Sequence, residues 1–237
     1  MKMKSVVIVA ASLAAVLQVA NAADITGKIT LKGTPPPERE ITDMAGNADC
    51  SKLHTAPVKT QHYVVVANGE LANVVVSLKG LSGKSTGESA TPAVLDQKGC
   101  EYVPQIFAIQ TNQKLIVKNS DPVLHNIHTT PLSTSGNKEE NKPQTAQGPD
   151  LSFVFSKPEP FLRFKCDVHQ WMYAWVTVFD HPYFAVSGKD GTFKIANVPP
   201  GKYTLEAAHR KAAPNGETKE IEVKDQGVTV DFTLEAK

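Results

Sequence analysis

The sequence predicts an all-β protein made of β-sandwiches. Apolar and polar side chains alternate through many short runs, which is the period of a strand with one buried face. Clusters of turn residues, such as Lys189-Asp190-Gly191, Pro199-Pro200-Gly201 and Pro214-Asn215-Gly216, separate the runs. No segment keeps a helical period over three turns. This combination of short strands and frequent turns favours sandwiches over an α/β fold.

The expected strands follow one another from residue 25 onward. The run 174–179 is apolar on both faces, so we expect it at the centre of a sheet. Two stretches, 33–62 and 129–150, lack a clear period and are expected to be loops or insertions. The runs that predict strands are 25–31, 63–66, 74–78, 115–117, 151–155, 162–164, 174–179, 193–195, 203–207, 221–223 and 228–234.

The first 22 residues have the pattern of a secretory signal peptide. Lys2 and Lys4 precede an apolar run over 6–19, and Ala20-Asn21-Ala22 supplies small residues for cleavage after Ala22. An N-terminal membrane anchor is the alternative, but the run is short for a spanning helix. We therefore expect an exported, periplasmic protein without a membrane span in the mature chain, in a compartment that permits disulfides.

Composition excludes some classes of function. The chain has 25 Lys and Arg against 24 Asp and Glu, a net charge of +1, so a nucleic acid partner is not expected. Three Cys are too few for a disulfide-built scaffold. No arrangement for nucleophilic catalysis and no Gly-rich phosphate loop can be identified. The sequence thus favours a protein that is not an enzyme.

The chemistry is concentrated in Cys166-Asp167-Val168-His169-Gln170-Trp171-Met172. A thiolate, an imidazole and a thioether lie within seven residues, directly after the expected strand 162–164. Two His, one Cys and a weak axial Met form the ligand set of an electron-transfer copper site. A further ligand must come from elsewhere, and His125 in Asp121-Pro122-Val123-Leu124-His125-Asn126 can supply it.

At these residues the chain resembles the cupredoxins, the family of plastocyanin and azurin. The matching segments run from Tyr102-Val103-Pro104 through 115–121 to His125-Asn126, and from Phe153 through Pro158 to Val178. The likeness covers roughly residues 92–180. The ligand loop has the short spacing of amicyanin. The resemblance implies a Greek-key β-sandwich that binds one type 1 copper ion.

The resemblance also assigns roles to individual residues. It makes His125, Cys166 and His169 the strong ligands and Met172 the weak axial ligand. Asn126 matches a family position whose side chain ties the two ligand loops together. Two features depart from the small members of the family. The segment 129–150 is an insertion, and His128 lies close enough to His125 to compete as the ligand.

Cys50 and Cys100 remain once Cys166 is assigned to the metal. Two cysteines in an oxidising compartment most often pair, so we expect a bridge that holds the segment 33–62 against the cupredoxin. The spacing of Cys50 and His54 leaves a second metal site as the alternative.

The C-terminal region resembles the carboxypeptidase regulatory-like, transthyretin-type β-sandwich. The similarity lies in 187–195 and 198–205, and the family's first strands match 25–29 and 71–76, far upstream. We therefore expect the cupredoxin to be inserted into this second sandwich. The expected parts are the signal peptide 1–22, the first sandwich strands 23–82, the cupredoxin 83–180 and the remaining sandwich 181–237. Two domains in tandem are the alternative.

These features predict a one-electron carrier that meets a redox protein, such as a cytochrome c-like protein, a dehydrogenase or an oxidase, in transient contacts. The alternatives are copper storage, delivery or sensing, and adhesion or carbohydrate binding by the second sandwich. We expect His169 to reach the surface through an apolar patch formed by Leu124, Pro131 and Trp171. Trp171 as a core residue packed under the loop is the alternative.

Overall fold

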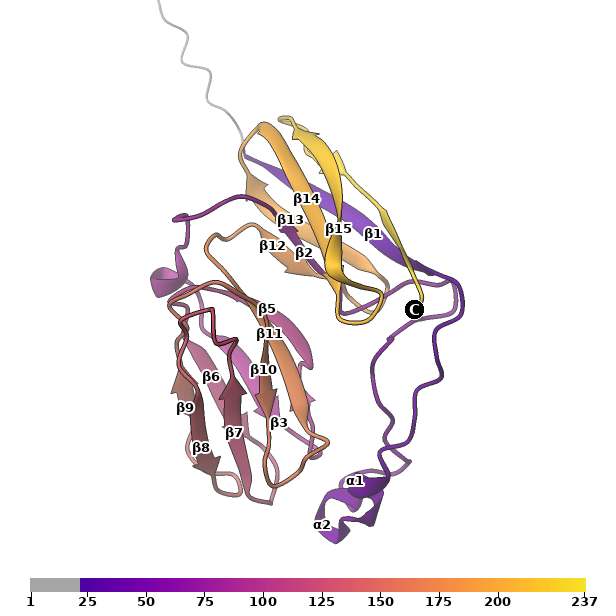
Figure 1. The fold of residues 1–237 in the computed structure, drawn as a ribbon, viewed down its shortest axis with the longest axis vertical. Coiled ribbons are helices and arrows are strands. Elements are labelled where there is room, and N and C mark those ends of the chain that lie inside the picture. Colours follow the sequence, from indigo (N-terminus) through magenta and orange to yellow (C-terminus); the bar gives the residue numbers. More distant parts are fainter. Residues whose placement is uncertain (1–21) are drawn as a thin grey trace, which may run out of the picture.

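The computed structural model of the chain describes residues 22–237 and contains two β-sandwiches (Figure 1). Strands make up 46% of the described residues and helices 6%, which confirms the all-β prediction. The expected signal peptide lies outside the described residues apart from Ala22. Between residues 22 and 237, no helix combines the length and the apolar character that crossing a membrane requires.

One sandwich, here called the central sandwich, is formed by the middle of the chain. Phe153, Phe155 and Phe164 fill its core, with ring centroids about 6 Å apart in edge-to-face contact. The first sheet has the order β4 (Tyr102–Val103), β3 (Ala93–Gln97), β6 (Leu115–Asn119) and β9 (Leu151–Phe153). The second has the order β5 (Ile106–Gln110), β11 (Tyr173–Phe179), β10 (Glu159–Lys165), β7 (His125–Thr130) and β8 (Glu140–Gln144).

The other sandwich, here called the outer sandwich, combines strands from both ends of the described chain. One sheet contains β13 (Thr192–Val198), β1 (Ala23–Lys32), β16 (Val228–Thr229) and β17 (Phe232–Glu235). The facing sheet has the order β12 (Phe184–Val186), β2 (Val75–Leu78), β14 (Gly201–His209) and β15 (Ala213–Val223). β1 is antiparallel to β13 and parallel to β16 and β17, so residues before and after the central sandwich share one sheet.

Gly27 shows why β1 fits this position. A Cβ atom there would lie 1.9 Å from the carbonyl oxygen of Val230 and 2.8 Å from the ring of Phe193. Only glycine permits this close approach between β1 and its neighbours.

Asp180 joins the two chain crossings between the sandwiches. Its carboxylate accepts hydrogen bonds from the backbone N–H of Gly83 at 2.6 Å and from the hydroxyl of Thr111 at 3.0 Å. Its carbonyl oxygen accepts from the N–H of Lys84. The short 3-10 helix η1 (Gly87–Ser89) follows on the first crossing. The entry and exit of the central sandwich therefore lie side by side.

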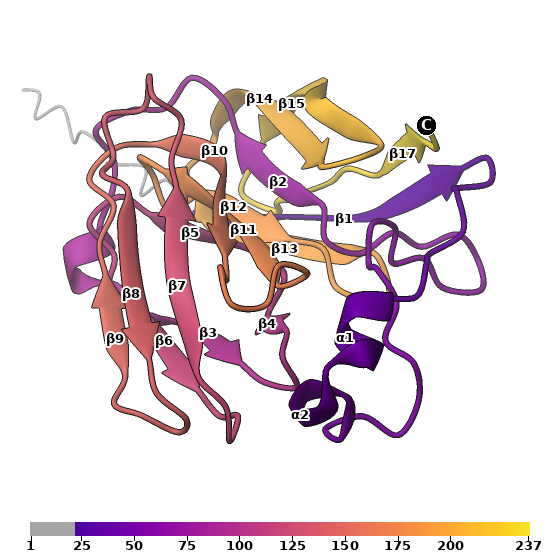
Figure 2. The same ribbon diagram turned by 60° about the horizontal axis from the view of Figure 1, so that its bottom comes forward.

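The segment 33–62, here called the strap, leaves the outer sandwich and packs on the central one. It contains α1 (Thr42–Gly46) and α2 (Ala48–Ser51), which Figure 2 shows beside the ends of β3 and β4. The side chain of Asn47 caps α2 by accepting hydrogen bonds from the N–H groups of Asp49 and Cys50. Met44 and Cys50 are buried in the core of the central sandwich. The expected loop is thus partly helical.

Several predictions of strands and loops differ from the structure, and β3, β4, β5, β7 and β12 were not among the predicted runs. The run 63–66 forms only an isolated bridge between Val65 and Leu71. The expected loop 129–150 contains β8, which pairs with β7 at the edge of its sheet. The sequence of β8 does not show the alternation typical of a strand, because an edge strand tolerates polar residues and a proline, here Pro143. The run 228–234 is divided into β16 and β17.

The fragment 181–237 should fail to fold by itself. It lacks β1, which lies between β13 and β16, and β2, which lies between β12 and β14, so neither sheet is continuous without them. Circular dichroism and thermal melting of the isolated fragment provide the measurement. A cooperative melting transition would show that the C-terminal strands form a complete domain, as the tandem arrangement requires.

Candidate metal centre

The hairpin between β10 and β11 positions Cys166 and His169. Cys166 directly follows β10, and Tyr173 begins β11. The loop between them is closed by two backbone hydrogen bonds: the N–H of Cys166 donates to Met172 O at 3.3 Å, and the N–H of Met172 donates to His169 O at 2.9 Å. These bonds fold His169 back toward the thiol of Cys166, 3.9 Å from its Nδ1.

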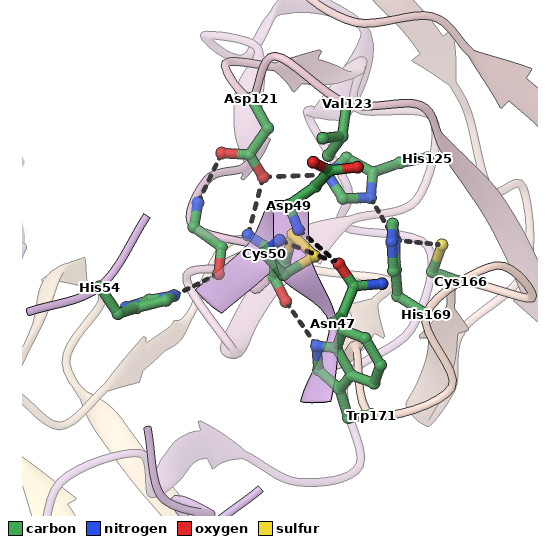
Figure 3. The surroundings of a disulfide bond; sticks show 12 residues. Asn47, Asp49, Cys50, His54, Asp121, Val123, His125, Cys166, His169 and Trp171 are labelled. Atoms are coloured by element: carbon green, nitrogen blue, oxygen red, sulfur yellow. Dashed lines mark hydrogen bonds and ion pairs between the residues drawn. A yellow bond between two sulfur atoms is a disulfide. The ribbon is translucent and has the colours of Figure 1, made fainter. Parts of the chain in front are cut away.

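β7 brings His125 to the same place, because this strand pairs with β10. The ligand atoms of His125, Cys166 and His169 all lie within 4.8 Å of one another, and all three residues are buried. The Nδ1 atoms of the two imidazoles are 3.0 Å apart, and Figure 3 shows His125 directed at His169 and His169 directed at the thiol of Cys166. Three of the four predicted ligands therefore converge.

These spacings suit a metal ion. Two nitrogen ligands about 2.0–2.1 Å from an ion at tetrahedral angles lie roughly 3.3 Å apart. The donors are two imidazoles and one thiolate, with the thioether of Met172 at the end of the same loop. Met172 is 1% exposed and belongs to the core of the central sandwich. Structural zinc sites usually add further Cys or His ligands, whereas His₂Cys with a weak thioether suits copper.

Asn126 connects the two ligand loops. Its Oδ1 accepts hydrogen bonds from the backbone N–H groups of Asp167 at 2.7 Å and Val168 at 3.3 Å, and from the thiol of Cys166 at 3.3 Å. Its backbone N–H donates to Cys166 Sγ at 3.5 Å. This residue thus links the loop that carries His125 to the loop that carries Cys166, the role expected from the resemblance.

Asp121 is a residue of the centre to which sequence reasoning gave no role. Its buried carboxylate accepts a hydrogen bond from His125 Nε2 at 2.9 Å and from the N–H groups of Gly99 and Cys100 at 2.6 and 2.7 Å. With Nε2 bound to a carboxylate, Nδ1 of His125 is the nitrogen left for a metal. The position of Asp121, four residues before the candidate ligand His125, was the sequence feature that could have indicated this role.

The pKa shifts of Cys166 and His169 favour the proton-free forms that bind a cation. Burial raises the pKa of the Cys166 thiol, but the nearby His125 imidazole and backbone N–H groups outweigh it and lower the pKa overall. Burial lowers the pKa of His169, and repulsion by His125 lowers it further. A more acidic thiol and a less basic imidazole release their protons more readily, as metal ligands must.

The strap covers this cluster. The predicted disulfide between Cys50 and Cys100 is confirmed, and both its sulfur atoms lie within 4.8 Å of a ring nitrogen of His169. The indole N–H of Trp171 donates to Cys100 O at 3.0 Å, and its ring lies 5.1 Å from that of His169. His169 is only 5% exposed. The disulfide and the indole therefore stand between this histidine and solvent.

His128 and His54, the alternative candidates for metal ligands, interact with other groups. The ring of His128 lies between carboxylates, with Nδ1 2.7 Å from Asp167 and Nε2 beside Glu139. Nε2 of His54 pairs with the carbonyl oxygen of Gly99 at 2.7 Å. Cys50 is in the disulfide, so it offers no thiolate for a site with His54.

The expected apolar patch is not formed by the three residues assigned to it. Leu124 precedes β7 and Pro131 follows it, so a strand of six residues, about 20 Å long, separates them. Trp171 packs against the disulfide loop, in line with its alternative role as a packing residue. Leu124, which is 46% exposed, is the one of the three that lies at the surface next to a candidate ligand.

Comparisons with known proteins find no protein-family model and no curated protein that matches the chain. Similar solved structures include the copper-containing nitrite reductase of Thermus scotoductus SA-01 (17% identity, 38% of this chain and 23% of that chain, TM-score 0.34). They also include the purple cupredoxin of Nitrosopumilus maritimus (22% identity, 36% and 98%, TM-score 0.30) and a copper(I) amicyanin variant (16% identity, 44% and 97%, TM-score 0.32).

Replacing Asp121 by Asn should weaken copper binding about 10- to 100-fold, because the partner that orients His125 is lost. Competition with a chelator of known affinity measures this effect. Asp150→Asn, at an exposed carboxylate, is the matched control and should leave the affinity unchanged. Equal affinities for the two variants would show that Asp121 does not orient the ligand.

The same variant should change the acid stability of the metal-free protein. Burial raises the pKa of Asp121, but hydrogen bonds from His125, Cys100 and Gly99 lower it overall. Its contribution to stability is therefore complete above the unfolded pKa of about 3.9 and is lost as pH falls through the lower folded pKa. The free energy of unfolding of Asp121→Asn should therefore fall less at acid pH than that of the unaltered protein. Urea unfolding curves recorded at several pH values measure this difference.

Proposed function

We propose that this protein is a type 1 copper protein that carries single electrons between partner proteins. The proposal rests on one observation: His125, Cys166 and His169 place two imidazole nitrogens and one sulfur around a common, buried point. Copper bound there would supply a redox couple between Cu(II) and Cu(I). The protein would hold it with these three residues and with Met172 as the weak ligand.

The surroundings of the ligands suit repeated electron transfer. Asp121 fixes His125 through Nε2, and Asn126 fixes the loop of Cys166 through backbone N–H groups. Ligands whose partners hold them in place need little rearrangement when the charge of the ion changes. Burial keeps water away from the thiolate, which limits its oxidation.

The burial of the candidate centre argues against copper delivery, which is the alternative function that would use similar ligands. A delivery protein must release its ion to a partner, which requires an accessible ligand. Here the three candidate ligands are at most 5% exposed, and a disulfide holds the strap over His169. This burial supports retention of the metal and exchange of electrons only.

We further propose that the protein is exported to the periplasm and is not an enzyme. The signal-like residues 1–22 and the confirmed disulfide support an oxidising compartment. A centre whose three candidate ligands are buried suits a carrier. Its partners would be redox proteins that dock briefly. The outer sandwich, similar to the regulatory-like domains, would serve as a structural or partner-binding unit.

The copper(II) form should be intensely coloured, because charge transfer from the Cys166 thiolate produces strong visible absorption. Cys166→Ala should remove the colour, whereas His128→Ala, at the neighbouring histidine held by carboxylates, should keep it. Visible absorption and electron paramagnetic resonance of the loaded proteins test this. A colourless copper complex of the unaltered protein would contradict the type 1 assignment.

Electrons should enter and leave near Leu124, the exposed apolar residue beside His125. Leu124→Lys should slow electron self-exchange at least several-fold, because like charges then face each other in the encounter pair. Pro131→Lys is the matched control, since it adds the same charge at the far end of β7. Nuclear magnetic resonance line broadening in mixtures of both oxidation states measures the rates. Equal slowing by both variants would exclude this face as the route.

A further inference from the structure

A second candidate binding site lies between the two sandwiches, on the outer face of the sheet that contains β10 and β11. It is a cavity of about 140 Å³. Ile106 and His209 in its wall are buried, whereas Gln61 and Lys211 are exposed, so the cavity has a closed floor and an open rim. The residues that matter for its chemistry are Arg163, Tyr173 and Trp175 from the central sandwich, His62 from the strap, and Arg210 and Lys211 from the outer sandwich.

Strand geometry separates this cavity from the metal centre. Arg163 and Trp175 are paired across β10 and β11, so their side chains lie on the same face of the sheet. Phe164 and Ala174, the next pair, point to the opposite face and belong to the core of the central sandwich. The cavity therefore uses the side of the sheet that the sandwich core does not.

Positive charge accumulates in this cavity without a counter-charge. None of its wall residues carries a carboxylate. Within residues 22–237, neither Arg163 nor Arg210 forms an ion pair, and the buried Nε of Arg163 has no hydrogen-bond partner. The nearby Glu38 carboxylate is occupied by the N–H of Tyr63 and the hydroxyl of Thr60.

Both guanidinium groups approach the same indole ring. Arg210 lies 3.6 Å from the ring centre of Trp175, and Arg163 lies 5.8 Å from it. Burial lowers the pKa of Arg210, and repulsion by Arg163 adds to this effect. Burial and the charge of Lys211 likewise lower the pKa of His62. One arginine would suffice to hold the indole, so two converging cations indicate a site for an anion.

We propose that this cavity binds a small aromatic carboxylate. The planar fork of a guanidinium matches a carboxylate in two parallel hydrogen bonds, and both Arg163 and Arg210 line the cavity. The apolar surfaces of Tyr173 and Ile106 provide contact for a ring. A cavity of about 150 Å³ holds benzene, so a single ring is the size that fits.

Calorimetric titration of the full mature chain with benzoate tests the proposal, with benzamide and inorganic phosphate titrated separately. We expect benzoate to saturate one site with a dissociation constant of about 1 mM or tighter. Benzamide, which has the ring without the charge, should bind at least tenfold more weakly. Phosphate, which has the charge without the ring, should also bind more weakly. Phosphate binding as tight as that of benzoate would overturn the aromatic part of the proposal, and absence of saturable benzoate binding would overturn all of it.

Two substitutions assign the binding to the cavity. Arg163→Gln and Arg210→Gln should each weaken benzoate binding about tenfold or more, since each removes a charge-assisted hydrogen bond. Lys118→Gln, which removes an exposed charge on β6, should have no effect. Thermal melting checks that each variant is folded. Because Arg210 lies closer to the Trp175 ring than Arg163 does, at 3.6 Å against 5.8 Å, the decisive variant is Arg163→Gln. Unchanged benzoate affinity in this folded variant would overturn the proposal.

Discussion

The carboxylate of Asp121 is the contact on which the organisation of the candidate metal centre depends. It binds Nε2 of His125 on one side and the N–H groups of Gly99 and Cys100 on the other. One buried group thus orients a candidate ligand and positions half of the disulfide. A buried carboxylate is stable only when such donors satisfy it, so each partner also holds the others in place. Ligand geometry and strap position are therefore coupled through a single side chain.

This coupling changes how the centre can communicate with other molecules. In the absence of the strap, the loop that carries His169 would form the end of the sandwich. With α2 and the disulfide above it, His169 is enclosed, whereas the exposed Leu124 directly precedes His125 in the chain. The bridge closes a loop of 50 residues, for which chain entropy predicts a stabilisation of about 4 kcal/mol. Opening the strap in the oxidised protein is correspondingly unfavourable.

The sequence was sufficient to predict the fold class, the order of most strands and the disulfide, because alternating polarity and cysteine number are local signals. It also named the three residues that converge, since a short loop keeps Cys166 and His169 together. It could not predict what covers them. The position of the strap depends on contacts between Met44 and a core formed more than 40 residues later. The contact of Arg210 with Trp175, which pairs with Arg163 in the central sandwich, likewise arises only when the two sandwiches pack together.

The parallel pairing of β1 with β17 has a mechanical consequence. Ala23 lies at the start of β1, and Glu235 at the end of β17 pairs with Lys32 at the far end of β1. A pull that draws Ala23 and Glu235 apart loads the hydrogen bonds of this ladder in shear, so that they share the tension. The central sandwich branches off between these strands and carries none of the tension while the ladder holds. The candidate metal ligands would keep their spacing in a protein stretched between Ala23 and Glu235.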